Sequence, residues 1–240
     1  TGHGWYDYSR DMPSESPSRS DSEPPESITV HGELGMAESL LERAGEAGIR
    51  VTVKIREQPG AGYIYIDGVV LMMTDGRTAT EVSARLGEDV VLFDLVADYA
   101  VAGHIALGLA QQNGQRARDI ATGFFASLGM TVSVIADTPG LCLMRTVCML
   151  ANEAADAVHQ QVCDVNAVDN AMRYGVNYPL GPLQWADRIS PAHVKSVLNN
   201  IQAAHSRSQR QDHDRYRCSP LIDSKVMQNN NFYPEAGSHE

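Results

Sequence analysis

Hydrophobic positions along the chain follow two different spacings, and the change comes near residue 137. Between residues 28 and 137, short runs of β-branched and aromatic residues alternate with stretches whose apolar residues recur every three or four positions. Such alternation is typical of strands and helices that build a largely parallel sheet. From residue 138 onward only the helical spacing remains. The pattern predicts an α/β region followed by an all-α region.

The elements expected in the α/β region can be named by residue range. We expect strands over Ile28–His31, Ile49–Ile55, Tyr63–Met73, Asp89–Val96 and Met130–Ala136, and helices over 34–47, 78–86, 99–111 and 116–128. Asp67 and Gly68 fit the central positions of a type I′ hairpin turn. Gly48 and Gly129 each follow a helix, at the position where a left-handed residue commonly ends one.

The all-α region begins with a long amphipathic helix. Apolar residues recur at helical spacing from Leu143, and the helix is expected to run to about residue 163. Pro139 suits its first turn, because the N–H that proline lacks is not used there. Thr138 or Asp137 would then be the N-cap.

Shorter helices and a polar tail follow. Ala167–Tyr174 is expected to be helical, with Asn166 as N-cap and Asp169 in its first turn, where an acidic residue is favourable. Pro191–Ala204 is a further expected helix. Residues 206–240 are polar, and their few apolar residues are expected to anchor a wrapping tail: Leu221, Val226, Phe232 and Tyr233.

The N-terminal residues differ from the rest of the chain. Residues 9–27 are rich in serine, proline and glutamate, with Met12 as their one large apolar residue. Such a segment buries too little surface to offset its ordering entropy, so we expect a flexible linker. Residues 1–8, with the cluster around Trp5, are expected to be the tail of a preceding helical domain. The domains expected after the linker are an α/β domain at 28–137 and a helical domain at 138–240 with a polar tail.

Charge and cysteine usage narrow the classes of function. The formal net charge of −11 argues against a nucleic-acid or anionic-membrane surface, and no apolar run of about 18 residues is present. The four cysteines show no CxxC spacing, which weakens a zinc or thioredoxin-like interpretation. Three of them lie in apolar helical sequence, where reduced thiols are common, so we expect a cytoplasmic protein.

Several motifs in the second half resemble one family. In chain order they are Asp137-Thr138-Pro139-Gly140, Arg145, Asn152-Glu153-Ala154, Val168-Asp169-Asn170-Ala171-Met172, Gly175, Pro179 and Gly181-Pro182-Leu183. Their order and spacing resemble the C-terminal domain of bacterial NAD-dependent 3-hydroxyacyl-CoA dehydrogenases. The resemblance implies a helical dimerisation domain that forms one wall of the acyl pocket, beside a Rossmann-like domain that binds NAD. It also implies a place in fatty acid β-oxidation or a related pathway.

Two further segments resemble the long bacterial form of this family, which carries two such domains and acts in phenylacetate degradation. Tyr174-Gly175-Val176-Asn177-Tyr178-Pro179 is similar to its second helical domain, and residues 1–8 are similar to the segment that closes the first. This resemblance implies that the chain corresponds to the C-terminal half of a longer enzyme. Its substrate would be 3-hydroxyadipyl-CoA or a related short acyl-CoA.

The residues that the family uses for catalysis are missing. The reaction moves a hydride from C3 of the hydroxyacyl group to nicotinamide, and the family uses a histidine base together with a positioning serine and asparagine. Met144 stands at the asparagine position, where a thioether cannot donate a hydrogen bond. The histidine segment falls near Leu92–Leu95, which has no histidine, and the serine segment falls near Met73–Gly76. We therefore assign no catalytic residue.

The loop expected to bind the dinucleotide is also altered. Val30–Ala37 lies between an expected strand and helix and keeps a first glycine, Gly32. Leu34 replaces the glycine that lets the backbone approach the pyrophosphate, and Glu33 adds like charge. Lys54 stands near the position where an acidic residue would bind the ribose. The loop predicts a degenerate Rossmann repeat that binds no NAD; chance similarity of a glycine-bearing βαβ unit is the alternative.

Other polar residues favour structural roles. Asn152 and Glu153 are expected to fix helix packing, and Arg145 to pair with a carboxylate or a helix C-terminus, with a CoA phosphate contact as the alternative. The remaining candidates are more typical of structure than of metal or cofactor binding: His104, His159, His205 and His213 with Asp212 and Asp214, and Met72, Met73, Met144, Met149 and Met172. No cofactor-binding or metal-binding residue is assigned.

Two functions remain after this comparison. In the first, the chain is a structural, pocket-shaping pseudo-repeat of a (3S)-3-hydroxyacyl-CoA dehydrogenase, with NAD bound by the parent enzyme, and it docks onto a homologous helical domain or forms a homodimer. In the second, the chain is a self-sufficient NAD-dependent dehydrogenase with relocated active-site residues. Binding of NADH separates the two.

Overall fold

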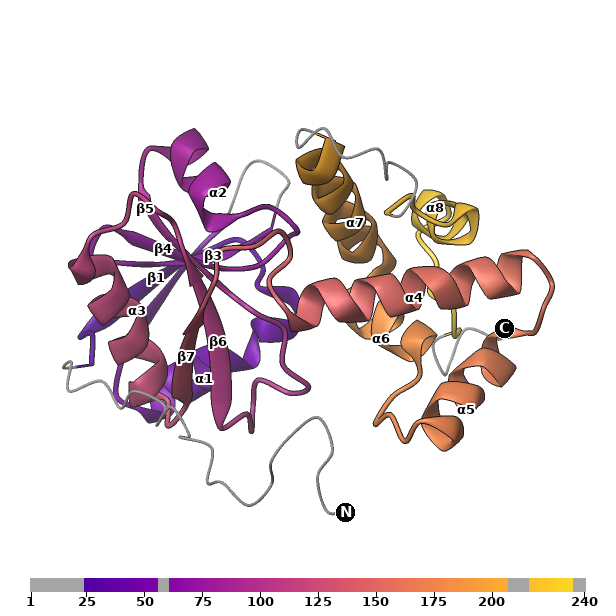
Figure 1. Cartoon of the computed structure of the whole chain (residues 1–240). Coiled ribbons are helices and arrows are strands. Elements are labelled where there is room, and N and C mark those ends of the chain that lie inside the picture. The colour runs from indigo at the N-terminus through magenta and orange to yellow at the C-terminus, as the bar shows by residue number, and fades with distance from the viewer. Residues whose placement is uncertain (1–23, 56–60, 207–215, 235–240) are drawn as a thin grey trace, which may run out of the picture.

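The computed structural model describes residues 24–55, 61–206 and 216–234 of the chain. They form two lobes that lie side by side (Figure 1): an α/β lobe, indigo to magenta, and a helical lobe, orange to yellow. The predicted fold class, an α/β region followed by an all-α region, is confirmed. The predicted tail at 1–8 and most of the linker at 9–27 lie outside the described residues. Among the described residues, no helix is long and apolar enough to cross a membrane.

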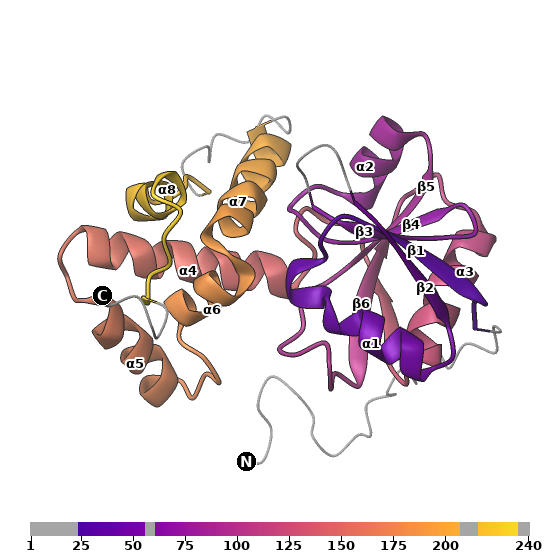
Figure 2. The ribbon, with the colours of Figure 1, turned by 180° about the vertical axis from the view of Figure 1, so that it is seen from behind.

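The α/β lobe is a seven-stranded sheet with helices on both faces. Its elements are β1 (Ser27–His31), the 3₁₀ turn η1 (Gly35–Ala37), α1 (Ser39–Glu46), β2 (Arg50–Lys54), β3 (Tyr63–Ile66), β4 (Val69–Met73), α2 (Ala79–Leu86), β5 (Asp89–Phe93), β6 (His104–Leu109), α3 (Gln115–Ser127) and β7 (Thr131–Ile135). The strand order is β2-β1-β3-β4-β5-β6-β7. Figure 2 shows the same ribbon from behind, with α1 in front of the strands.

The sheet is mixed, so the expectation of a largely parallel sheet is wrong. β1 and β2, β4 and β5, and β6 and β7 pair in parallel, whereas β3 runs antiparallel to both of its neighbours and β5 runs antiparallel to β6. The hairpin between β3 and β4 forms as expected, with left-handed φ values of 47° at Asp67 and 89° at Gly68. Short hairpin connections leave no room for the crossover helix that parallel pairing needs.

The expected helix over residues 99–111 is also wrong, because this segment contains β6. Ile105 and Leu109 are four apart, as in a helix, but Ile105 and Leu107 alternate with more exposed neighbours and are fully buried. Gly108 lies where a Cβ atom would come within 2.5 Å of the Leu141 side chain. Pairing with β5 on one side and β7 on the other decides the structure here.

Hydrophobic residues cover both faces of the sheet. One face packs on α1 and α3 through side chains such as Ile64, Val91 and Phe93. The other face packs on α2 through Val70 and Leu92. This three-layer arrangement buries β4 and β5 almost completely and brings their carboxyl ends to the side of the helical lobe.

The helical lobe is built around one long helix. Its elements are α4 (Leu143–His159), α5 (Val165–Gly175), α6 (Pro182–Ile189), α7 (Pro191–Ser206) and α8 (Pro220–Met227). α4 leaves the α/β lobe and passes between α7 and α8 on one side and α5 and α6 on the other (Figure 1). In the tail, Phe232 is buried and Leu221, Val226 and Tyr233 pack against the core, as predicted, while the most buried residue of α8 is Ile222.

Two predicted caps of this lobe are wrong. α4 begins at Leu143 rather than at Pro139, and neither Thr138 nor Asp137 caps it. α5 begins at Val165, and its N-cap is Asp164, whose side chain accepts a hydrogen bond from the N–H of Ala167. Neither helix is capped by the residue that its local sequence suggested.

Candidate functional site

The carboxyl ends of β4 and β5 meet the start of α4 at the junction of the two lobes. The N–H of Thr74, which follows β4, donates a hydrogen bond of 3.0 Å to the carbonyl of Phe93 at the end of β5. The N–H of Met144 in α4 reaches the carboxylate of Asp94, which follows β5. The structure therefore brings together the three segments expected to correspond to the family's catalytic motifs.

Asp94 is the most heavily hydrogen-bonded side chain of the junction. It is 2% exposed, and its two oxygens accept four backbone N–H bonds of 2.7 to 3.0 Å, from Leu95, Cys142, Leu143 and Met144. Three of these donors belong to the first turn of α4, whose N–H groups have no partner within the helix. The carboxylate thus caps α4 and complements its positive end.

Met144 fills an apolar position beneath this cap. Its side chain is fully buried, and the thiol of Cys148, one turn later, lies 3.6 Å from its sulfur. Burial raises the pKa of the Cys148 thiol, so that thiol stays protonated. Neither residue presents a polar atom to the junction that could hold a substrate oxygen.

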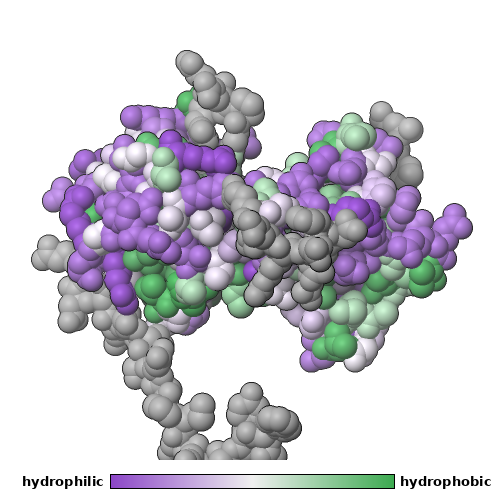
Figure 3. All heavy atoms as spheres, turned by 45° about the horizontal axis from the view of Figure 1, so that its top comes forward, coloured by the Kyte–Doolittle hydropathy of each residue, from purple (hydrophilic) through white to green (hydrophobic). Residues whose placement is uncertain are grey.

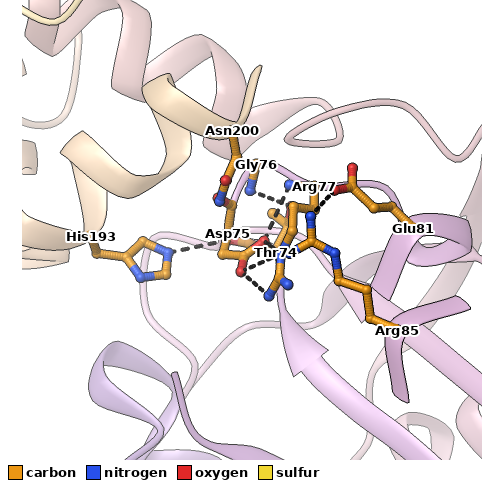
Figure 4. Close-up of polar contacts among 8 residues, drawn as sticks. All are labelled: Thr74, Asp75, Gly76, Arg77, Glu81, Arg85, His193 and Asn200. Atoms are coloured by element: carbon orange, nitrogen blue, oxygen red, sulfur yellow. Dashed lines mark hydrogen bonds and ion pairs between the residues drawn. The ribbon is translucent and has the colours of Figure 1, made fainter. Parts of the chain in front are cut away.

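The loop after β4 is packed into the junction as well. Thr74 is fully buried and Asp75 nearly so, and the Asp75 carboxylate forms an ion pair with Arg77 (Figure 4). On the other side, α7 contributes His193, whose Nε2 donates a 3.2 Å hydrogen bond to the Thr74 carbonyl, and Asn200, whose Nδ2 donates a 2.9 Å bond to the Asp75 carbonyl. Each polar side chain named here has a hydrogen-bond or ion-pair partner within the protein.

Asp137 closes the opposite edge of the junction. Its carboxylate accepts hydrogen bonds from the N–H groups of Ala79 and Thr80 at 2.7 and 2.9 Å, and from the Thr80 hydroxyl. It therefore caps α2, not α4. Asp94 caps α4 and Asp137 caps α2, so each carboxylate binds a helix that is distant from it in the sequence.

The loop between β1 and α1 does not fit a dinucleotide. Leu34 is only 5% exposed, and its N–H donates to the carboxylate of Glu38 at 3.1 Å. The carbonyl of Glu33 accepts from the N–H of Gly62, and the N–H of Gly32 donates to Lys54. An NAD pyrophosphate needs free backbone N–H groups and a close approach. In this chain the Leu34 side chain and the Glu38 carboxylate occupy that place, so the loop does not fit the pyrophosphate of NAD.

An apolar cavity of about 300 Å³ lies beside the junction, in the helical lobe. Leu143, Val147 and Leu150 of α4 form one wall, and Trp185 of α6 forms part of another. The remaining lining residues are Ala97, Thr146, Tyr178, Pro179 and Pro182. Such a cavity accepts an apolar group, and its lining contains no histidine, carboxylate, lysine or cysteine.

The other predicted structural residues have mixed outcomes. Asn152 fixes packing as predicted: it is buried, donates to the Arg217 carbonyl and accepts from the Ser219 N–H, whereas Glu153 is exposed. Arg145 has no carboxylate partner among the described residues; it contacts the Tyr216 hydroxyl and lies 5.4 Å from the centre of that ring.

Asp169 is not a first-turn acid. It is 1% exposed and accepts from the N–H groups of Leu183 and Gln184, so it caps α6 and also accepts from the Tyr233 hydroxyl. Gly181 makes this possible, because a Cβ atom there would lie 2.1 Å from the Asp169 carboxyl carbon.

The histidines and methionines show no site chemistry. His205 stacks on Tyr216, His104 and His159 are exposed, and His213 with Asp212 and Asp214 lies outside the described residues. Among the described residues, no three histidine, cysteine or acidic side chains are placed to hold a metal. Met72, Met73 and Met144 are buried in the core as predicted, and Met149 packs against that core.

The motif resemblance agrees with comparisons against known proteins. Residues 71–139 match the model of the 3-hydroxybutyryl-CoA dehydrogenase reduced Rossmann-fold domain, and residues 140–234 match that of the 3-hydroxyacyl-CoA dehydrogenase C-terminal domain. The chain belongs to the 3-hydroxyacyl-CoA dehydrogenase family. The matched Rossmann-type segment begins within β4 and leaves out β1 to β3, which include the altered loop.

Relatives within this family are moderately similar. The 3-hydroxyadipyl-CoA dehydrogenase of Escherichia coli (strain K12) is 34% identical over 200 residues, which cover 81% of this chain and 40% of that protein. The probable 3-hydroxybutyryl-CoA dehydrogenase of Deinococcus radiodurans is 31% identical over 157 residues, 65% of this chain and 51% of that one. The chain thus spans about half or less of these relatives' lengths.

Solved structures are similar in fold. The crystal structure of 3-hydroxybutyryl-CoA dehydrogenase from Escherichia coli K12 has a TM-score of 0.64 and 34% identity, covering 72% of this chain and 34% of that one. An (S)-3-hydroxybutyryl-CoA dehydrogenase from Ralstonia eutropha has a TM-score of 0.59 at 17% identity. The match covers 82% of this chain and 83% of that one. The second likeness concerns the fold alone.

Sequence reasoning missed the residues that organise the junction: Asp94, Asp137, His193 and Asn200. Asp94 directly follows a buried apolar strand, and this is the one local feature that could have indicated a polar role for it. His193 and Asn200 lie seven residues apart, two turns of one helix, but nothing in that spacing identifies the loop that they bind.

Proposed function

We propose that this chain is a non-catalytic, pocket-shaping module of a (3S)-3-hydroxyacyl-CoA dehydrogenase, which converts 3-hydroxyacyl-CoA and NAD to 3-oxoacyl-CoA and NADH. A separate dinucleotide-binding domain, in the same polypeptide or another, would supply the NAD site and the catalytic residues. The observation that carries the proposal is Asp94. Its buried carboxylate accepts four backbone N–H bonds, and it lies in the segment near Leu92–Leu95 where the family is expected to carry its catalytic histidine.

The apolar cavity supports the pocket-shaping part of the proposal. Its lining is almost wholly hydrophobic, and α4 and α6 hold it open next to the junction. An acyl chain transferred from water into such a cavity is stabilised in proportion to the area that it buries. Short acyl-CoA thioesters, as in phenylacetate degradation or β-oxidation, are the proposed substrates of the assembled enzyme, and the cytoplasm is the proposed compartment.

A homologous helical domain is the proposed partner. Figure 3 shows hydrophobic residues gathered at the lower right, on the outer part of the helical lobe. Exposed apolar side chains near α5 include Val162, Tyr174 and Val176, with exposures of 73%, 79% and 54%. An exposed apolar surface of this kind marks an association site, and a second domain of the same family offers a matching one.

Titration of the purified chain with NADH tests the proposal against the alternative of a self-sufficient dehydrogenase. We expect no saturable enhancement of nucleotide fluorescence and a dissociation constant weaker than about 100 μM, about −5.5 kcal/mol. Tighter binding with a stoichiometry of one would favour the alternative, in which active-site residues have moved. Binding of a 3-hydroxyacyl-CoA without NADH would support the pocket-shaping role.

A further inference from the structure

The two lobes are joined by more than the chain connection between β7 and α4. α7 of the helical lobe lies along the β4–α2 loop, residues 74–78 (Figure 4). His193 donates a hydrogen bond to the Thr74 carbonyl, and Asn200 donates one to the Asp75 carbonyl. The two donors lie two turns apart on one helix, so together they fix both the position and the direction of α7.

Gly76 lies between these two hydrogen bonds and touches the backbone of α7. Its φ is +97°, and a Cβ atom there would lie 2.4 Å from the Val197 carbonyl oxygen and 2.8 Å from the Val197 Cα. A side chain could be accommodated only if α7 moved away from the loop. The backbone of one lobe therefore packs directly on the backbone of the other.

Hydrogen bonds within the loop hold its backbone in place. The Asp75 carboxylate accepts hydrogen bonds from the Arg77 N–H and Nε, at 3.0 to 3.1 Å, and the Thr74 hydroxyl oxygen accepts one of 3.4 Å from the Gly76 N–H. Because these contacts fix the loop internally, the carbonyl groups of Thr74 and Asp75 stay turned toward α7. The interface needs little further ordering to form.

We propose that α7 and the β4–α2 loop form a latch that holds the two lobes in one arrangement, and that the latch opens when His193 takes up a proton. The proposal goes beyond the proposed function and does not depend on it, because it rests on contacts within this chain. It assigns a conformational role to a loop that lies where the family's serine segment is expected.

Proton sensitivity follows from the surroundings of His193. The Thr74 carbonyl can only accept, so the Nε2 of His193 carries the proton and the neutral ring lacks one at Nδ1. Within the described part of the chain, the charged groups facing the ring belong to the loop: the Asp75 carboxylate and, paired with it, the Arg77 guanidinium. Burial lowers the pKa of His193, and the Thr74 carbonyl and the Asp75 charge offset only part of this effect.

The direction of the pH effect can be worked out from this shift. An open latch exposes the imidazole and returns its pKa to about 6.5. Because the open form then binds the proton more tightly than the closed form, opening becomes more favourable as the pH falls through about 6.5. Above that pH, His193 is neutral in both forms and the latch stays closed.

Hydrogen exchange on two glycine variants and two asparagine variants tests the mechanical part. In Gly76→Ala we expect amides of residues 74–77 and 194–200 to exchange at least about tenfold faster, because the new methyl group separates the lobes. Gly87→Ala is the matched control, since Gly87 has a φ of +72° but no atom within 4 Å of its Cβ position. Equal exchange in the two variants would overturn the latch.

A milder pair covers the case in which Gly76→Ala does not fold. Asn200→Ala removes one inter-lobe hydrogen bond, whereas Asn199→Ala changes an exposed neighbour on the same helix. We expect about threefold to tenfold faster exchange of the loop amides in Asn200→Ala, as for the loss of one hydrogen bond, and little change in Asn199→Ala. Loop exchange unaffected by Asn200→Ala would contradict the proposal.

A pH series tests the proton-sensitive part. We compare protection factors, corrected for intrinsic exchange, between about pH 7.5 and 5.5, where an exposed histidine titrates. As the pH is lowered, the protection factors of residues 74–77 should fall about tenfold in the wild type. They should fall equally in His104→Gln, which changes an exposed histidine. His193→Gln keeps a side-chain N–H donor that does not titrate and should lose none. A pH dependence that persists in His193→Gln would overturn the assignment to this residue.

Discussion

The backbone N–H of Met144 donates a 2.9 Å hydrogen bond to the carboxylate of Asp94. These two residues come from the segments where the family is expected to carry its positioning asparagine and its catalytic histidine. In this chain they bind each other, and the bond belongs to the cap of α4. Groups that would act on a substrate elsewhere in the family here fix the first helix of the helical lobe to the sheet.

Replacement of the cap is expected to reduce stability. Asp94→Asn keeps the size of the side chain but replaces one accepting oxygen with an NH₂ group that faces backbone donors. We expect a loss of about 2–4 kcal/mol in the free energy of unfolding, since hydrogen bonds to a buried charge are lost and their donors remain unpaired. Urea unfolding measures it. Asp98→Asn, an exposed carboxylate in the same connection, should change stability little; equal effects would refute the cap.

Several elements of this fold could be predicted from local sequence, and the caps could not. The turn at Asp67-Gly68 and the helix ends at Gly48 and Gly129 depend on the φ of one or two residues, which the residue type nearly fixes. Asp94 and Asp137 act on helices 48 and 58 residues away in sequence, respectively. Their roles depend on tertiary position, which spacing along the chain does not encode.

The secondary structure of β6 also depends on tertiary contacts rather than on local spacing. The spacing of Ile105 and Leu109 suits a helix, and the segment is short enough for either structure. Its neighbours β5 and β7 offer unpaired edges on both sides, and pairing with them satisfies more backbone groups than an isolated helix of this length. For the site, the sequence predicts that the family's catalytic residues are missing, but it does not predict the contacts that Asp94 and Asp137 make there.

Substitution of Met144 separates packing from catalysis. Met144→Ala should lower the free energy of unfolding by roughly 2–5 kcal/mol, because it removes a fully buried side chain. Met144→Asn restores the family residue but should yield no dehydrogenase activity, since the sequence predicts no histidine base after β5 and the amide would lie in an apolar site. Thermal unfolding and turnover assays measure the two effects. Activity in the asparagine variant would mean that a base is present after all.

The cysteines should react very unequally. Cys142 is exposed, whereas burial raises the pKa of Cys148, and burial with the nearby Asp223 charge raises that of Cys218 to about 12. With iodoacetamide at about pH 8, we expect Cys142 to be alkylated more than about 100-fold faster than Cys148 or Cys218. Mass spectrometry of timed samples shows this, with the urea-unfolded chain as control. Equal rates in the folded protein would contradict the packing described for α4 and α8.

Association through the helical lobe should depend on its exposed apolar side chains. Val176→Asp is expected to weaken self-association, or docking to a homologous helical domain, by about tenfold or more, because a charge would be buried at the contact. Val101→Asp is the matched control: Val101 is 78% exposed but belongs to the α/β lobe. Sedimentation velocity over a concentration series compares the two. If the wild type remains a monomer at every concentration and binds no such domain, the proposed partner is wrong.

The most direct test of the account is the reaction itself, with the purified 240-residue chain, NAD and a (3S)-3-hydroxyacyl-CoA. General-base loss alone typically lowers rates by about 100- to 10,000-fold, and loss of cofactor positioning lowers them further. We therefore predict no NADH formation above the rate of an Asp94→Asn control, while addition of an intact family dehydrogenase to the same sample produces NADH at once. NADH formation by the chain alone, saturable in both substrates, would contradict the assignment of a non-catalytic module.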